Sequence, residues 1–415
     1  MSRLRRFLGL LGPGLVTGAA DDDPSGVVTY TIAGTRYGVG LLWTAVITWP
    51  LMAAVQLMCA RVGMVTGRGL VGALRRRFPR RVILVGTIGL LIANTINIGA
   101  DLSAMADAAE LFTGLNSHLW VILFGGGIAW ATVRLRYAAL ANVLKWLTLA
   151  LLAYVACALY VGPDWGAVGR ATFLPALPHG SRMWSTVVAI LGTTISPYLF
   201  FWQASQEVEE ERAKGRHRVQ DRQGASEHEI QRRRIDVLTG TFFSNVVMFF
   251  IILTAAMTLN AHGVMGISTS REAMEALAPI AGRFASGLYA LAIIGVGLLA
   301  VPTLSGSAAY AFAELFRWRD GLDLNLRQAP AFYAVVLLAT LGGVAMDWLN
   351  VAPISALYWS AVINGVLSPF LLTGVLLVAS DAHAMAQQPS SLLSRAMVLL
   401  TILGMTGAAV GMFVF

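Results

Sequence analysis

The chain has 415 residues, of which 57% are hydrophobic and 13% are charged, and its formal net charge is +8. Soluble domains carry about 25% charged residues, so this composition excludes an ordinary soluble protein and indicates an integral membrane protein. Only two cysteines occur, Cys59 and Cys157, and both lie in apolar segments, which excludes a disulfide framework or a cysteine metal cluster. The 42 glycines fit close approach between membrane helices.

Apolar segments of bilayer-spanning length predict an all-α membrane protein with eleven transmembrane helices. They cover residues 7–35, 40–60, 82–106, 118–133, 142–162, 184–208, 237–258, 283–314, 330–348, 355–379 and 393–414. With a cytoplasmic N-terminus and an outside C-terminus, 25 of the 30 lysines and arginines fall in cytoplasmic segments, as the positive-inside rule expects for a protein of the cytoplasmic membrane. The positive charge is therefore a topology signal and does not indicate nucleic acid as a partner. We interpret the charged loop at 211–235 as a solvated linker, with a regulatory site as the alternative.

Three aspartates, a proline and a glycine interrupt the first helix at 21–26. A charge at that depth costs roughly 2.5–3.5 kcal/mol on insertion scales, and broken backbone persists there where it lines a cavity. Aspartate before proline is also an ordinary helix start. Near mid-membrane we expect Asp23 to bind a cation as well, with the carbonyl group of Ala20 as a second ligand. Asp21 and Asp22 cannot both share that face, so we expect one or both to point into an aqueous vestibule, with Asp22 a further metal candidate.

A second interruption, at 191–199, has the same design in the sixth helix. Pro197 removes a backbone donor and clashes with the preceding turn, which frees carbonyl groups near Thr193 and Thr194, beside the hydroxyl of Ser196. A simple proline kink is the alternative reading. Two broken helices at equivalent places in two five-helix halves indicate an inverted repeat. The predicted halves are 1–165 and 184–379, followed by an additional helix at 393–414, and together they form a single membrane domain over 1–415.

Polar residues in two other helices are candidates for a pathway or a site. Asn94, Asn97 and Asp101 lie on one face of the third helix, and in lipid that face must meet protein or water. We interpret it as pathway lining, with a hydrogen-bonded helix contact as the alternative for the two asparagines. Asn364, in the tenth helix, is a site candidate by position, although packing through small residues explains it nearly as well. All six histidines fall in loops or at helix ends, so no membrane-embedded imidazole is available to relay protons.

Three motifs together resemble those of one known transporter family. Gly12-Pro13-Gly14 followed by Asp23-Pro24-Ser25-Gly26 resembles the Gly-Pro-Gly and Asp-Pro-Gly-Asn of the natural resistance-associated macrophage protein (NRAMP) divalent-metal transporters. Ile98-Gly99-Ala100-Asp101-Leu102 is similar to the family's third-helix motif, and Ser196-Pro197-Tyr198 lies where the family has Met-Pro-His. The resemblance covers essentially the whole chain. It implies a LeuT-like fold and alternating access around a mid-membrane metal site.

The resemblance also implies roles for matched positions. Asp23 matches the family's metal-binding aspartate, Ala20 its first carbonyl donor and Thr193 its second. Asp101 matches an aspartate placed on the family's proton route.

Four positions depart from the family pattern. The asparagine ligand is replaced by Gly26, the methionine ligand by Ser196, the sixth-helix histidine by Tyr198 and the third-helix glutamate by Ala104. Oxygen ligands and water suit Mg²⁺, Ca²⁺ and Mn²⁺ better than softer metals, and the loss of a ligand at Gly26 leaves room for the waters that Mg²⁺ prefers to keep. The pattern resembles the NRAMP-related magnesium transporters more than the iron and manganese members. It leaves proton coupling open.

The sequence therefore predicts a carrier, not an enzyme, with a divalent cation, Mn²⁺ or Mg²⁺, as its substrate and the lipid bilayer as its surroundings. No cofactor and no obligate protein partner are expected. The first halves of the two broken helices should rock to open the site. The expected metal ligands are Asp23, Ala20, Thr193 and Ser196, with Asp22, Gly26, Thr194, Tyr198 and Asn364 as further candidates and Asp101, Asn97 and Asn94 as pathway residues.

Two alternatives belong to other functional classes. A sodium-coupled carrier of small organic solutes on the same scaffold would need a half-helix N-terminus free for an anionic group, and three adjacent aspartates argue against it. An intramembrane aspartyl protease would need Asp23 and Asp101 to share one water, and the usual Gly-x-Gly-Asp and Tyr-Asp motifs are absent from the sequence.

Overall fold

The computed structural model describes residues 17–18, 20–135, 147–175, 178–277, 279, 282, 285–349 and 352–414. Within these ranges the chain is helical and contains no β-strand. Eight helical segments of the described chain are long and apolar enough to cross a membrane. The segment predicted at 118–133 forms α7 (Ser117–Arg134), and the described part of 142–162 forms a 3-10 turn η2 (Leu147–Leu151) and α9 (Leu152–Val161). Residues 7–16 of the predicted first helix and 142–146 of the fifth lie outside the described residues.

The remaining long helices follow the predicted segments with shifted ends. They are α3 (Pro24–Tyr37), α4 (Trp43–Thr66), α6 (Arg80–Thr113), α11 (Ser181–Thr194), α12 (Pro197–Ala213), α13 (Glu227–Thr258), α16 (Ala285–Phe316), α17 (Pro330–Met346), α18 (Pro353–Ser380) and α19 (Leu392–Val414). Three short helices connect them: α5 (Leu70–Leu74), α10 (Trp165–Phe173) and α14 (Ser270–Glu275).

The stretch 211–235, expected to be a solvated linker, is mostly exposed or partly exposed, but its two ends are helical. The helix α12 continues to Ala213, and α13 already begins at Glu227 because Ser226 and Glu229 form a capping box at its start. Arg222 and Arg233, from the same stretch, are buried. The number of charges in the stretch does not indicate that these two arginines are buried. Arg222 donates to the carbonyl group of Gly67, and Arg233 pairs with the carboxylate of Glu207 in α12.

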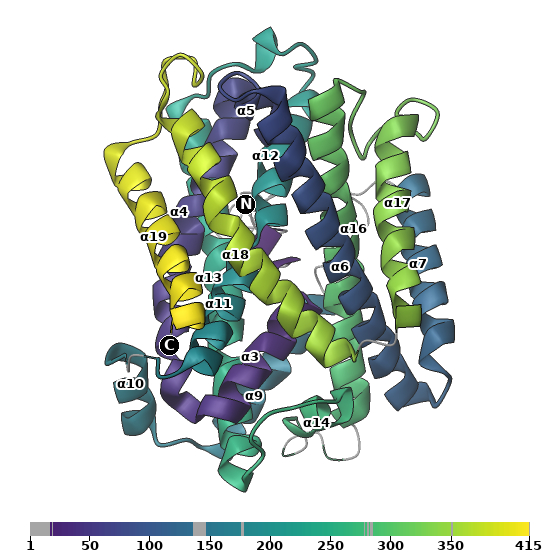
Figure 1. The fold of residues 1–415 in the computed structure, drawn as a ribbon, viewed down its shortest axis with the longest axis vertical. Helices are drawn as coiled ribbons and strands as arrows, with labels where there is room; N and C mark the ends of the chain where they lie inside the picture. Colours follow the sequence, from purple (N-terminus) through teal and green to yellow (C-terminus); the bar gives the residue numbers. More distant parts are fainter. Residues whose placement is uncertain are drawn as a thin grey trace, which may run out of the picture.

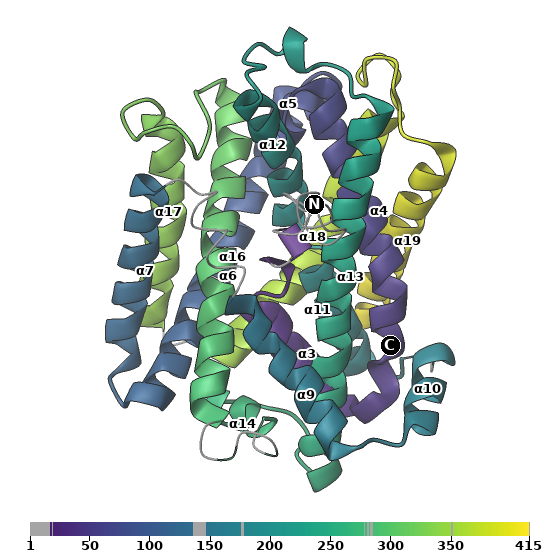
Figure 2. The same ribbon diagram turned by 180° about the vertical axis from the view of Figure 1, so that it is seen from behind.

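The helices form one bundle with an inner and an outer set (Figures 1 and 2). Both views place α3, α11 and α18 near the centre, α7 beside α17 at one edge, and α19 at the opposite edge. Large apolar side chains on the outer helices are exposed, among them Trp130 of α7, Leu338 of α17 and Phe413 of α19. Such exposed apolar faces are suited to contact with lipid.

Glycines let the central helices approach to backbone contact. A Cβ atom at Gly192 of α11 would lie 2.0 Å from the carbonyl oxygen of Ala361 in α18, and one at Gly34 of α3 would lie 2.3 Å from that of Ile252 in α13. No larger residue fits at either point, which is the use that membrane bundles make of small residues. These contacts fix how closely α11 approaches α18 and α3 approaches α13.

Candidate metal site

The first helix is broken at the predicted aspartates. Residues 17–18 and 20–21 are helical, Asp22 and Asp23 are not, and α3 restarts at Pro24. Asp23 caps the new helix, with φ −67° and ψ 171°, and its Oδ1 atom accepts hydrogen bonds from the amide of Gly26 at 2.8 Å and the hydroxyl of Ser25 at 2.6 Å. The Oδ1 atom therefore has the hydrogen bonds of an N-cap. The Oδ2 atom takes no part in capping the helix.

The second oxygen of Asp23 faces two other helices. Its Oδ2 atom lies 3.2 Å from the side-chain amide of Asn97 in α6 and 3.4 Å from the hydroxyl of Tyr198 in α12. The Oδ1 atom of Asn97 in turn accepts a hydrogen bond from Ser360 of α18 at 2.7 Å. Asp23 is 1% exposed, so this carboxylate sits at the junction of α3, α6 and α12, away from bulk solvent.

The second break follows the predicted design. The helix α11 ends at Thr194, and α12 begins at Pro197. The hydroxyl of Ser196 lies 2.6 Å from the carbonyl oxygen of Gly192 and 2.8 Å from that of Thr193, and Ser368 of α18 donates to the carbonyl oxygen of Ile195 at 2.7 Å. In this conformation Ser196 is thus bonded back to its own helix, the arrangement expected of a proline kink. The carbonyl groups freed by Pro197 are satisfied by hydroxyls.

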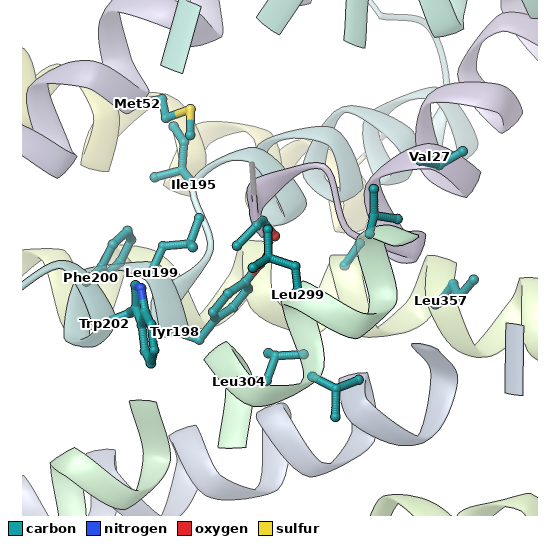
Figure 3. Packing of buried hydrophobic residues seen from close by; sticks show 14 of the residues in the cluster. Val27, Met52, Ile195, Tyr198, Leu199, Phe200, Trp202, Leu299, Leu304 and Leu357 are labelled. Atoms are coloured by element: carbon teal, nitrogen blue, oxygen red, sulfur yellow. The ribbon is translucent and has the colours of Figure 1, made fainter. Parts of the chain in front are cut away.

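The two breaks meet through hydroxyl groups. Tyr198 donates to the carbonyl oxygen of Ala20 at 2.8 Å, and Figure 3 shows its ring directed from α12 towards the chain before α3. The hydroxyls of Ser25 and Thr193 lie 3.2 Å apart. The carbonyl oxygens of both Ala20 and Thr193 therefore face a hydroxyl hydrogen that can rotate away. One carboxylate with carbonyl and hydroxyl oxygens is a donor set for a hard cation.

Asp21 and Asp22 turn to a different helix from Asp23. Both accept a hydrogen bond from Ser244 of α13, Asp21 at 2.6 Å and Asp22 at 3.2 Å, and both are buried. The expected aqueous vestibule is not seen at either carboxylate in this conformation. Among the described residues, no three His, Cys, Asp or Glu side chains converge as a metal cluster. A cation at Asp23 would therefore depend on neutral oxygens for its other ligands.

The polar face of α6 divides into three environments. Asn94 donates to the carbonyl oxygen of Leu304 and to the hydroxyl of Ser307, both in α16, so it forms a helix contact. Asn97 reaches Asp23, as described above. Asp101 is buried, and its carboxylate lies beside the backbone amide of Ser25.

The remaining candidates, Gly26, Thr194 and Asn364, make no hydrogen bond to Asp23 through a side chain in the described chain. A Cβ atom at Gly26 would lie 3.3 Å from Thr193 Oγ1 and 3.4 Å from the carbonyl oxygen of Asp21. A group of the size of one methyl therefore almost fits beside Gly26 in this conformation. The hydroxyl of Thr194 lies 3.1 Å from that of Tyr30. Asn364 is buried in α18.

Two serines in α18, one turn before and one turn after Asn364, contact the residues around the breaks. Ser360 reaches Asn97, and Ser368 reaches the carbonyl group of Ile195. Ser25, which donates to Asp23, is a third contributor that the analysis of single positions missed. The signal for the α18 pair was present as serines one turn before and one turn after Asn364.

Comparison with known proteins gives consistent matches over nearly the whole chain. The sequence profile of a family described as Natural resistance-associated macrophage protein-like (Nramp) matches residues 14–415. The divalent metal cation transporter MntH of Deinococcus radiodurans is 27% identical over 394 residues, which cover 92% of this chain and 84% of that protein. MntH of Caldanaerobacter subterraneus is 26% identical over 414 residues, covering 95% and 90%.

Solved structures share the fold. A crystal structure of the Eremococcus coleocola manganese transporter matches with a TM-score of 0.76 at 18% identity, covering 98% of this chain and 86% of that chain. Mhp1, a nucleobase-cation-symport-1 family transporter in a closed conformation, matches with a TM-score of 0.57 at 15% identity, covering 96% and 91%.

Proposed function

The chain belongs to the Nramp family, and from that premise we propose that it is a membrane carrier that moves a divalent metal cation, Mn²⁺ or Mg²⁺, by alternating access. The observation that carries the proposal is the buried carboxylate of Asp23, which joins the break before α3 to Tyr198 at the start of α12. Hydrogen bonds from four neighbours offset part of the cost of burying this carboxylate, but no positive side chain pairs with it in the described chain. A divalent cation passing between the breaks would supply the positive charge.

The ligands follow from the contacts around the breaks. Asp23 would supply the negative charge, and the carbonyl groups of Ala20 and Thr193 would supply neutral oxygens once their hydroxyl partners rotate. Ser196 would bind directly or through water. The relatives' names support this substrate class, since they are a divalent metal cation transporter and a manganese transporter. An all-oxygen donor set favours Mg²⁺ and Mn²⁺ over softer metals.

The proposed architecture has eleven transmembrane helices arranged as two inverted five-helix repeats and one additional helix. The breaks before α3 and between α11 and α12 stand at equivalent places in the two repeats, which supports this reading. The N-terminus would be cytoplasmic and the C-terminus outside, because that orientation puts most of the arginines inside. The helical segments that precede the two breaks would rock to open the site.

A sodium-coupled carrier of small organic solutes remains the second candidate. It is favoured by the likeness of the fold to a Na⁺-coupled sialic acid symporter, with a TM-score of 0.52 at 11% identity over 99% of this chain and 97% of that chain. The three aspartates at the first break would repel an anionic solute group, so the metal is preferred.

A liposome flux assay with Asp23→Asn tests the proposal. Asparagine is as good an N-cap as aspartate, so this variant keeps the helix start and removes only the charge. We expect it to lose Mn²⁺ and Mg²⁺ flux at least tenfold. Asp164→Asn, at the exposed N-cap of α10, is the matched control and should transport as the wild type does. Full flux in Asp23→Asn would overturn the proposal, and uptake of amino acids in place of metals would favour the second candidate.

A further inference from the structure

A cavity of about 660 Å³ lies at one end of the bundle, far from the two breaks, where α4, α12 and α16 end around α5 (upper part of Figure 1). Its lining is strongly basic. Six arginines contribute to it against two acidic residues. The arginines are Arg68, Arg75, Arg76, Arg212, Arg222 and Arg317, and the acids are Glu314 and Asp320. The proposed orientation places this end in the cytoplasm.

Both acidic residues already have partners. Glu314 accepts a hydrogen bond from the amide of Gly72 at 3.0 Å, and its carboxylate is so close to Gly69 that a Cβ atom there would lie 2.1 Å from Oε1. Asp320 forms an ion pair with Arg212 at 3.1 Å. The remaining arginines of the cavity form no ion pair within the described chain, and its positive charges outnumber its negative ones.

Arg222 is the most unusual member of the group. It is 4% exposed and donates only to carbonyl oxygens, those of Gly67 at 3.2 Å, Arg216 at 3.1 Å and His217 at 2.7 Å. Burial lowers the pKa of Arg222 and the nearby charge of Arg212 lowers it further, while the charges of Asp320 and Glu209 offset part of this effect. A buried charge that makes no direct ion pair is costly, and an anion in the cavity would reduce that cost.

Arginines at the mouth of the cavity repel one another in the same way. Burial lowers the pKa of Arg75, and the charges of Arg317, Arg80 and Arg68 add to the effect. Arg317 is exposed and has φ 61°, a left-handed conformation that is unfavourable for a residue with a Cβ atom and readily adopted by glycine. An arginine side chain therefore stands at a position where the backbone conformation favours glycine.

We propose that this cavity binds a phosphate-bearing anion of more than one negative charge. Guanidinium groups bind phosphate oxygens in pairs with a fixed fork geometry. Here they come from the loops before and after α5, from α12 and the loop after it, and from the end of α16. Two sources share this chemistry: the headgroup of an anionic lipid in the cytoplasmic leaflet and a soluble phosphate of the cytoplasm. Bound there, the anion ties α5, α12 and α16 together at one end of the bundle.

The test uses the purified full chain in nanodiscs and two probes. Inorganic pyrophosphate is titrated by calorimetry in pure phosphatidylcholine, and retained phosphatidylglycerol is counted by native mass spectrometry in mixed nanodiscs. The double variant Arg75→Gln with Arg317→Gln should weaken binding of at least one probe about tenfold or more, the size of losing charged hydrogen bonds. The probe that responds identifies the source.

The control variant also removes two arginines at this end of the bundle, but at positions outside the cavity. Arg81 and Arg234 are exposed and do not line the cavity, so Arg81→Gln with Arg234→Gln should bind as the wild type does. Equal binding by all three proteins in both arms overturns the proposal, as does equal weakening in the two variants, which would mean diffuse attraction only. If the test variant does not fold, Arg317→Gly replaces it. Glycine relieves the backbone strain, so weaker binding with an unchanged or higher unfolding temperature supports the site, and unchanged binding refutes it.

Discussion

The hydroxyl of Tyr198 donates a hydrogen bond to the carbonyl oxygen of Ala20 at 2.8 Å and lies 3.4 Å from Asp23 Oδ2. One side chain from the second helix break thus reaches two proposed cation ligands of the first. Its hydrogen carries a partial positive charge to the point where the cation would bind. Tyr198 and the cation therefore compete for the same oxygens.

Replacement of Tyr198 by phenylalanine tests this competition. We expect Tyr198→Phe to bind Mn²⁺ and Mg²⁺ several-fold more tightly, because the carbonyl group of Ala20 loses a hydrogen bond of about 0.5–1.5 kcal/mol that the cation would otherwise have to break. Calorimetry on the purified protein measures the change. Weaker binding by the variant would mean that the hydroxyl is itself a ligand.

A second carboxylate beside Asp23 should make stability depend on metal. In Asn97→Asp the new carboxylate would face Asp23 across the present 3.2 Å contact, and like charges at that distance repel. We expect a lower unfolding temperature in chelator and a larger rise than in the wild type when Mg²⁺ or Mn²⁺ is added. Asn94→Asp is the control on the same helix face, since the side-chain amide of Asn94 donates to Leu304 and Ser307 and, among the described residues, makes no hydrogen bond to Asp23. It should be destabilised without rescue, and equal rescue of both variants would contradict the prediction.

The backbone contact between α11 and α18 predicts a steric effect. A methyl group at Gly192 would lie 2.0 Å from the carbonyl oxygen of Ala361 and 2.3 Å from the amide of Gly365. Gly192→Ala should therefore lower the free energy of unfolding by about 1–3 kcal/mol or more, the cost of overpacking. Gly126→Ala in α7 meets no atom within 4 Å and should be close to neutral. Thermal unfolding in detergent compares the two, and equal stability would show that α18 can move away freely.

A buried arginine holds the start of α13 to α12. Arg233 pairs with Glu207 at 2.6 Å, with Asp236 at 2.5 Å and with Glu210. Glu207 also accepts from Gln203 at 2.7 Å. Removal of one partner from a buried ion pair costs about 3–5 kcal/mol, so Arg233→Met should destabilise the protein by that order.

The next residue along α13 provides the control for this prediction. Arg234 is exposed and has no such partners among the described residues, and Arg234→Met should change stability by less than about 0.5 kcal/mol. Chemical unfolding measures both variants. Similar effects would show that the acidic groups around Arg233 are neutral when it is absent.

Local signals in the sequence located the two breaks, while contacts between distant residues stayed hidden. Pro24 and Pro197 end a hydrogen-bond ladder wherever they occur in a helix, so the breaks could be predicted from a few neighbouring residues. The contact between Asn97 and Asp23 spans 74 residues and depends on how α6 crosses α3. The contacts of α18 could not be predicted for the same reason. Gly365 packs against Val188 of α11, and in this packing Ser360 reaches Asn97 and Ser368 reaches the carbonyl group of Ile195.

The hydroxyls at the two breaks bear on the return half of a transport cycle. Tyr198 and Ser196 give the carbonyl oxygens of Ala20 and Thr193 partners from the chain itself, so the protein can close around its centre with these two carbonyl groups satisfied. A carrier that can close without a bound ion can return empty to its starting conformation, so exchange of one ion for another is not obligatory. It should then produce net accumulation down a gradient, not one-for-one exchange.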